Sequence, residues 1–229
     1  MKLIASDFDG TLYRNRIITD RDRSAIAEWQ ARGNLFGIVT GRGAGIIETA
    51  AEHGITLDYA ITENGAVVLD RDGNILYEDW FYRGIAKEYY DFAYSTDFGF
   101  QDKNAPDADP ADMQKEHQLA LLLEDEVQAA ALAAQLNAHF DGRLVSYSNG
   151  WWINTVKYGT SKATGIAHYA EIMGIARKDI YTVGDYFNDL PMLTAFDGYV
   201  VATCHPDMRQ HVRHVCDDIA HLIELAGKD

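Results

Sequence analysis

Cysteine and long hydrophobic runs are both scarce in this sequence. The only two cysteines among 229 residues, Cys204 and Cys216, do not form a CxxC pair. A disulfide framework or a thiolate metal site would need more cysteines at defined spacings. No stretch approaches the roughly 20 apolar residues of a membrane-spanning helix, and the first apolar run ends at Ser6, too early for a signal peptide. We therefore expect a cytoplasmic protein with reduced thiols and no membrane association.

Basic residues are also few relative to acidic ones. The chain has 20 basic and 35 acidic residues, which gives a net charge of −15. A nucleic-acid-binding protein needs a basic surface, so we expect no nucleic-acid partner. An acidic protein can still bind a small phosphorylated molecule if a local cation, such as a bound metal ion, offsets the repulsion. The chain is long enough for one large domain or two small ones.

Short apolar runs alternate with helical patterns at both ends of the chain. Thr19 is a plausible helix cap and Gly33 a helix stop, between two such runs. This order predicts an α/β, Rossmann-like parallel sheet with helices on both faces. The strands are expected at 2–6, 35–39, 59–62, 180–183 and 198–202, the helix that follows the fourth strand at 188–195, and a helical tail after the last strand.

The middle of the chain breaks this rhythm. A hairpin is indicated at 66–69 and 75–77, and the segment 83–157 has the mixed pattern of a smaller α+β domain. We therefore predict a core made of 1–82 and 158–229, with 83–157 inserted in it. The expected elements of the insert are helices at 85–94 and 125–140, strands at 118–123, 143–148 and 151–156, and a polar loop at 101–112.

Two carboxylates, Asp7 and Asp9, follow the first predicted strand, and Gly10 allows a sharp turn next to them. Ligands of open α/β sheets bind beyond the carboxyl ends of the strands. Carboxylates that converge there repel each other unless a cation lies between them, and oxygen ligands of this kind suit Mg²⁺. The alternative is a simple acidic turn. The similar letters at 70–73 lie between two hairpin strands and are interpreted as such a turn.

Three further motifs stand at strand ends or helix starts. Thr40-Gly41-Arg42 offers a hydroxyl and backbone N–H groups to a phosphoryl oxygen, or is merely a helix cap. Lys162 lies in the first turn of a helix, where the dipole disfavours a cation unless an anion is near; a solvated lysine is the alternative. The turn at 184–189 adds side chains able to bind metal, or is a capped turn: Asp185, Asn188 and Asp189.

Taken together, these motifs resemble the haloacid dehalogenase superfamily of phosphohydrolases. The layout is most similar to its Cof-type branch and to the related sucrose-phosphate and archaeal phosphoglycolate phosphatases. The resemblance lies in 7–12, 40–42, 159–162 and 184–189, in the family's order, and in Glu63-Asn64-Gly65-Ala66. It covers the core well and the insert poorly. Two departures are Tyr186, where the family often has serine, and Thr203-Cys204-His205, where many relatives have small residues.

The resemblance implies a role for each motif residue. Asp7 would be the nucleophile and a metal ligand, and Asp9 the general acid and base, with its backbone carbonyl on the metal. Thr40, Gly41 and Lys162 would bind the phosphoryl group. The remaining assignments are Asp185 as a metal ligand, Asn188 and Asp189 as its supports, and Arg42 and Asn64 as substrate-binding residues.

The function implied is that of a Mg²⁺-dependent phosphatase. It would hydrolyse a sugar phosphate or similar small phosphomonoester through an aspartyl-phosphate, with the insert acting as a cap. A phosphomutase of the same superfamily and a non-catalytic phosphate-binding regulatory module are the alternatives. No oligomeric state follows from the sequence.

Overall fold

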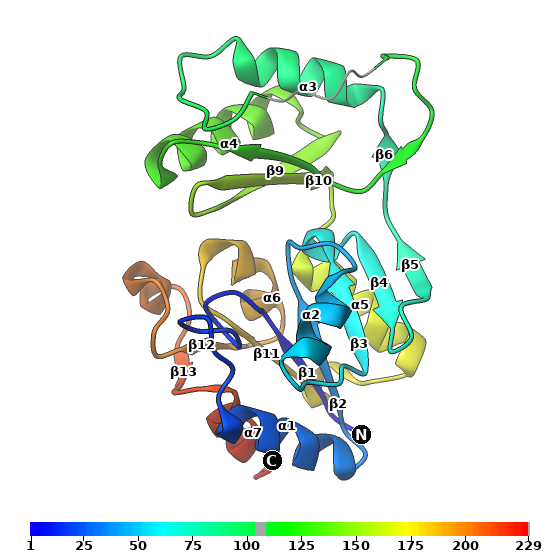
Figure 1. Ribbon diagram of the computed structural model, residues 1–229, viewed down its shortest axis with the longest axis vertical. Helices are drawn as coiled ribbons and strands as arrows, with labels where there is room; N and C mark the ends of the chain where they lie inside the picture. Colours follow the sequence, from blue (N-terminus) through cyan, green and yellow to red (C-terminus); the bar gives the residue numbers. More distant parts are fainter. Residues whose placement is uncertain (104–108, 229) are drawn as a thin grey trace. The chain divides into compact units, whose positions relative to one another are not determined.

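The computed structural model describes residues 1–103 and 109–228. The chain divides into two compact units, the first made of Met1–Tyr77 and Ser161–Asp229 and the second of Glu78–Thr160 (Figure 1). The predicted insert, 83–157, lies within the second unit. The core unit is thus assembled from both ends of the chain.

A mixed sheet of eight strands forms the centre of the first unit. Its six strands from β13 to β3 pair in parallel, and β4 pairs antiparallel with β3. The central strand is β1, whose Leu3 is in register with Ile180 on one side and Leu35 on the other. In sheet order the strands are β13 (His214–Cys216), β12 (Tyr199–Val201), β11 (Ile180–Gly184), β1 (Leu3–Ser6), β2 (Leu35–Val39), β3 (Tyr59–Thr62), β4 (Val67–Asp70) and β5 (Ile75–Glu78).

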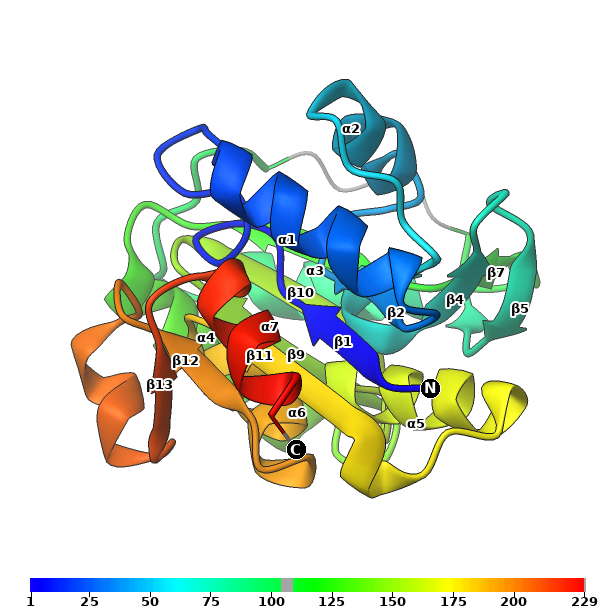
Figure 2. The ribbon, with the colours of Figure 1, turned by 90° about the horizontal axis from the view of Figure 1, so that it is seen from below.

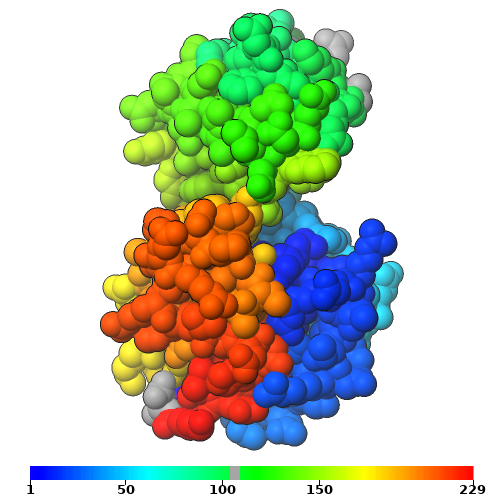
Figure 3. Space-filling view, turned by 90° about the vertical axis from the view of Figure 1, so that its left-hand side faces the viewer, coloured from blue at the N-terminus to red at the C-terminus, as the bar shows by residue number. Residues whose placement is uncertain are grey.

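Helices cover both faces of this sheet, as the alternating pattern predicts. Figure 2 shows α1 (Asp20–Ala31) and α7 (Ile219–Ala226) side by side on one face, with α5 (Lys162–Met173) and α6 (Leu190–Ala195) on the other. The short α2 (Ile46–Glu52) connects β2 to β3. In Figure 3 the blue N-terminal and red C-terminal segments are in contact within this unit, so the two chain ends share one core.

Local sequence signals explain where these helices begin. The Thr19 side chain accepts a hydrogen bond from the Asp22 amide at the start of α1. At the start of α5, Ser161 and Thr164 form a reciprocal capping box, and Gly174 ends the helix in the left-handed conformation. Within the described residues, no helix has both the length and the apolar character needed to cross a membrane.

The second unit has its own small hydrophobic core. In it α3 (Ile85–Tyr94) and α4 (Glu126–His139) accompany the antiparallel sheet β8 (Leu119–Leu122), β10 (Trp152–Lys157) and β9 (Leu144–Asn149). Tyr89, Leu132 and Ile153 are fully buried between these elements. A two-stranded ribbon of β6 (Phe81–Tyr82) and β7 (Lys115–Glu116) completes the unit. This is the α+β pattern that the sequence predicts.

Two expectations about the C-terminal part are wrong in detail. The tail after the last predicted strand contains a further strand, β13, before α7, because its three residues pair in parallel with β12. The helix expected at 188–195 begins at Leu190, after a short 3₁₀ turn at Phe187–Asp189. Part of the predicted loop 101–112 lies outside the described residues.

A close contact inside the sheet gives a stability prediction. A Cβ atom added to Gly37 in β2 would lie 2.4 Å from the buried Tyr59 ring, whose hydroxyl donates to the Ile4 carbonyl. We expect Gly37→Ala to lower the free energy of unfolding by about 1–3 kcal/mol through overpacking. Gly45→Ala is the control, since nothing lies within 4 Å of its added Cβ. Equal midpoints for the two variants in urea denaturation would contradict this prediction.

Candidate active site

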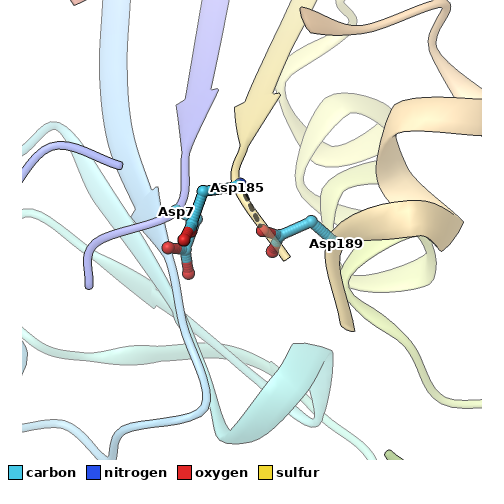
Figure 4. A group of neighbouring side chains, drawn as sticks. All are labelled: Asp7, Asp185 and Asp189. Carbon is cyan, nitrogen blue, oxygen red and sulfur yellow. Dashed lines mark hydrogen bonds between the residues drawn. The ribbon is translucent and has the colours of Figure 1, made fainter. Parts of the chain in front are cut away.

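Two neighbouring strands deliver carboxylates to one edge of the sheet. Ser6 is in register with Val183, so Asp7 and Asp185 emerge side by side at the carboxyl ends of β1 and β11. The Asp7 amide continues the pairing by donating to the Val183 carbonyl at 2.9 Å. Together with Asp189, they form an acidic cluster in which one oxygen from each carboxylate lies within 4.8 Å of the others (Figure 4).

Lys162, the first residue of α5, lies in the same cluster. Its ammonium donates to Asp7 Oδ1 at 2.6 Å and to Asp189 Oδ1 at 2.5 Å, and its side chain is fully buried. The helix dipole disfavours a cation at this position, and the two carboxylates offset that cost. A buried ammonium of this kind needs such partners, since an uncompensated one would cost several kcal/mol.

The Asp189 carboxylate also shapes the loop that contains Asp185. Its Oδ2 accepts the backbone N–H group of Asp185 at 2.9 Å (Figure 4). The same oxygen accepts the backbone N–H group of Tyr186 at 3.1 Å. Its Oδ1 meanwhile accepts from Lys162. Asn188 is buried in the same 3₁₀ turn. Asp189 therefore links the lysine to the turn after β11.

Burial and crowding of charge perturb the pKa values of the cluster. Burial raises the pKa of Asp7 well above its usual range, and the neighbouring carboxylates of Asp189 and Asp185 raise it further, against the lowering effect of Lys162. Burial and repulsion from Asp189 raise the pKa of Asp185 to about 6. Burial alone would lower the pKa of Lys162, but Asp189 and Asp7 raise it above its ordinary value.

The donor set fits a divalent cation. Three carboxylates against one ammonium leave two excess negative charges when all are ionised. A hard divalent ion such as Mg²⁺ would balance them and prefers oxygen ligands. Gly10, at φ +85°, makes room beside the cluster, because a Cβ there would lie 2.3 Å from Asp185 Oδ2. The ligands available from side chains are those of Asp7, Asp185 and Asp189.

Asp9 does not join this cluster with its side chain. Both of its carboxylate oxygens accept from the Arg42 guanidinium, at 2.7 and 2.6 Å, and the pair is about half exposed. Arg42 also lies over the Phe8 ring, 5.1 Å from its centre. The predicted metal contact of Asp9 through its backbone carbonyl stays a prediction. Arg42 thus contacts the expected general acid, and its predicted role in binding substrate stays a prediction.

Thr40 is buried at the carboxyl end of β2, next to β1 in the sheet. Its hydroxyl accepts the Arg42 amide at 3.1 Å, and its carbonyl accepts the Asn64 amide at 2.9 Å. Gly41 lies between Thr40 and Arg42 in this turn. Asn64 is buried with φ of 54°, in a turn at the end of β3. The Asn64 amide thus contacts the turn at 40–42.

The acidic hairpin at 70–73 behaves differently. One Asp70 oxygen accepts the amides of Asp72 and Asn74, and the other accepts the Asn74 side chain. These hydrogen bonds, first among them that of the Asn74 side chain, lower the pKa of Asp70. The turn interpretation of this segment is therefore correct, and its acidity has a local structural cause.

Comparisons with known proteins show the family to which the chain belongs. The family model of the haloacid dehalogenase-like hydrolases matches residues 4–105 and 93–221. The chain belongs to this family. The predicted superfamily and the predicted enzyme class, a phosphatase of this family, are confirmed.

Individual relatives are distant in sequence but similar in length and fold. A phosphoglycolate phosphatase of Natronomonas pharaonis is 25% identical over 93% of this chain and 90% of its own. A haloacid dehalogenase-like hydrolase from B. subtilis has a TM-score of 0.82 at 19% identity, covering 98% of this chain and 99% of that one. The subclass IIB sugar phosphatase BT4131 has a TM-score of 0.80 at 18% identity, with 99% of each chain covered. The likeness of the two structures establishes the shared fold.

Sequence reasoning underestimated two residues of the site. The sequence predicts Asp189 as a side chain able to bind metal and as a support for Asp185, and the structure adds its contact with Lys162 in the acidic cluster. Thr11 lies inside the first motif but received no role, although its hydroxyl donates to Asp185 Oδ1 at 2.8 Å. The sequence signal for a role of Thr11 is its position directly after Gly10. The sequence does not show that its hydroxyl donates to a residue 174 positions away.

The raised pKa of Asp185 predicts a pH-dependent response to metal. Without metal, the stability that its raised pKa provides is present below the ordinary aspartate pKa and is lost as pH rises through about 6. Mg²⁺ binds the ionised form, so saturating Mg²⁺ should raise Tm by roughly 5–10 °C at pH 7.5 and far less at pH 5. Thermal melts with EDTA or MgCl₂ measure this. Asp185→Asn should lose the response and Asp70→Asn should keep it; equal Mg²⁺ shifts at both pH values would refute the assignment.

Proposed function

We propose that this protein is a Mg²⁺-dependent phosphatase that forms a phosphoryl intermediate on Asp7. The observation that supports this best is the buried contact between Asp7 and Lys162, beside the carboxylates of Asp185 and Asp189. A carboxylate held by a protonated lysine at the carboxyl edge of a parallel sheet is placed to meet an incoming phosphoryl group. Bound Mg²⁺ would neutralise charge on the phosphoryl oxygens.

In the proposed first step, an Asp7 oxygen attacks phosphorus as the bond from phosphorus to the leaving oxygen breaks. Asp9 gives its proton to that oxygen, so the alcohol leaves neutral. Lys162 holds phosphoryl oxygens through charge-assisted hydrogen bonds, as would the Thr40 hydroxyl and the Gly41 amide. In the second step, water attacks the aspartyl-phosphate and passes a proton to Asp9, which frees Asp7 and releases phosphate.

The Arg42–Asp9 ion pair bears on this cycle. Both Asp9 carboxylate oxygens accept hydrogen bonds from Arg42, whereas in the proposed first step Asp9 gives a proton to the leaving oxygen. We propose that substrate draws Arg42 away from Asp9 and that Arg42 then contacts the substrate. Asn64 contributes by holding the 40–42 turn, and Asn188 and Asp189 by holding Asp185.

The substrate class is a small phosphorylated metabolite, with sugar phosphates as the first candidates. Two relatives act on such molecules by name, one a phosphoglycolate phosphatase and one a sugar phosphatase. The role of the insert, 83–157, as a cap that excludes water stays a prediction. So does a cytoplasmic location, which two free, buried cysteines favour.

Substitution of the nucleophile tests the covalent mechanism. Asp7→Asn keeps the shape of the side chain but removes the attacking charge, so we expect hydrolysis of p-nitrophenyl phosphate to fall by at least about 10³-fold with the fold retained. Asp70→Asn is the matched control and should keep full activity. Activity at the wild-type level in Asp7→Asn would exclude the intermediate. Phosphoryl return to the substrate without release of free phosphate would instead identify a phosphomutase.

Substitution of Asp9 should affect turnover and Mg²⁺ binding differently. Loss of proton transfer in Asp9→Asn should reduce turnover by about 10²–10⁴-fold. Binding of Mg²⁺ should remain, because the carboxylates that could hold the ion are those of Asp7, Asp185 and Asp189, and the Asp9 side chain lies outside this cluster. Isothermal titration with Mg²⁺ and a steady-state assay read the two effects independently. Loss of Mg²⁺ affinity together with activity would show that the Asp9 side chain is itself a ligand.

A further inference from the structure

A fully buried carboxylate lies outside the acidic cluster, in the first turn of α1. Asp22 Oδ2 accepts from Arg14 Nη2 at 2.9 Å and from the Thr19 hydroxyl at 2.9 Å. Its Oδ1 accepts the Ala220 amide, in α7, at 3.0 Å. Both oxygens are thus satisfied by three groups, two from the connection before α1 and one from α7. A buried carboxylate with so many partners has a fixed position, since losing any of them would be costly.

Arg14 connects the buried Asp22 carboxylate to the loop after β1. Its second nitrogen, Nη1, donates to the Thr11 carbonyl at 2.7 Å, while Nη2 remains on Asp22. Arg14 and Ile17 exchange backbone hydrogen bonds across a two-residue turn formed by Asn15 and Arg16, both at positive φ. The turn fixes the Arg14 backbone, and the planar guanidinium spans the gap between loop and helix.

Thr11 completes the connection to the acidic cluster. It is fully buried, and its hydroxyl donates to Asp185 Oδ1 at 2.8 Å. The adjacent Gly10 lies so close to the Asp185 carboxylate that no side chain would fit between them. The orientation of Asp185 thus depends on where residues 10 and 11 are held, and Arg14 holds Thr11 by its backbone.

We propose that Arg14 and Asp22 are positioning residues for the cation-binding carboxylate Asp185, acting through Thr11. Groups that orient a metal ligand typically change metal affinity by about 10–100-fold when they are lost. The inference rests on the proposed function in one respect, that the cluster binds Mg²⁺. The competing interpretation is that the ion pair only stabilises the start of α1.

Arg14→Lys separates these interpretations. Lysine keeps a positive charge beside Asp22, so the fold is retained, but it replaces the two guanidinium nitrogens that contact Thr11 and Asp22 separately with one ammonium, which lacks their fixed planar spacing. Isothermal titration of the full-length chain with Mg²⁺ alone should show a Kd about 10-fold weaker than wild type. At saturating Mg²⁺, kcat for p-nitrophenyl phosphate should recover towards the wild-type value.

Arg23→Lys is the matched control. Arg23 lies in the same helix start and also bridges a carbonyl, that of Ile18, and a carboxylate, that of Asp20, but it does not contact Thr11. We expect its Mg²⁺ affinity to equal that of wild type. Equal weakening in the two lysine variants would mean that the effect is general loosening of α1, and would overturn the proposal.

Thr11 provides an independent readout. Thr11→Val, which removes the hydroxyl, should weaken Mg²⁺ binding, and Thr11→Ser, which keeps it, should restore most of the affinity. The double variant Arg14→Lys/Thr11→Val should bind no more weakly than Thr11→Val alone, because both act on one connection. Multiplicative effects, or wild-type affinity in Arg14→Lys, would refute the inference. A wild-type chain that binds Mg²⁺ but hydrolyses no phosphomonoester would instead contradict the proposed function and leave these titrations valid.

Discussion

The site depends on one buried ammonium held between two carboxylates. Lys162 has no access to solvent, and its contacts with Asp7 and Asp189 join three segments that are far apart in the chain. Burial of such a group is unfavourable without partners, so the carboxylates must stay close to it. Because these carboxylates lie so close together, the acidic cluster carries more negative charge than Lys162 neutralises. The proposed affinity for a divalent cation would therefore follow from the way in which the buried lysine is neutralised.

The sheet supplies the precision that this arrangement needs. Parallel pairing of β1 with β11 brings Asp7 and Asp185 together through backbone hydrogen bonds. Helix capping at Ser161 then directs Lys162 towards them. Regular elements therefore place the charged groups. The connections after β1 and β11, at 8–17 and 185–189, are held by side-chain contacts from Arg14 and Asp189.

Much of this could be predicted from the sequence, for identifiable reasons. Apolar runs, Thr19 and Gly174 define strands and helix ends by local chemistry. Asp7 and Asp185 lie together because parallel strands end at one edge, and Lys162 reaches them from the start of α5. The pairing of β13, the double contact of Asp189 and the link from Asp22 to Thr11 could not be predicted. They depend on partners distant in sequence, and no local pattern encodes them.

The central position of β1 affects how the chain assembles during synthesis. β1 is made long before one of its two neighbours, β11, which begins only at Ile180, after the whole second unit. Until then one edge of β1 exposes unpaired backbone groups next to apolar side chains, a state that favours slow folding and self-association. The unit 78–160, with its own apolar core, is complete before that edge closes. Nascent chains halted before residue 180 should therefore depend most on chaperones.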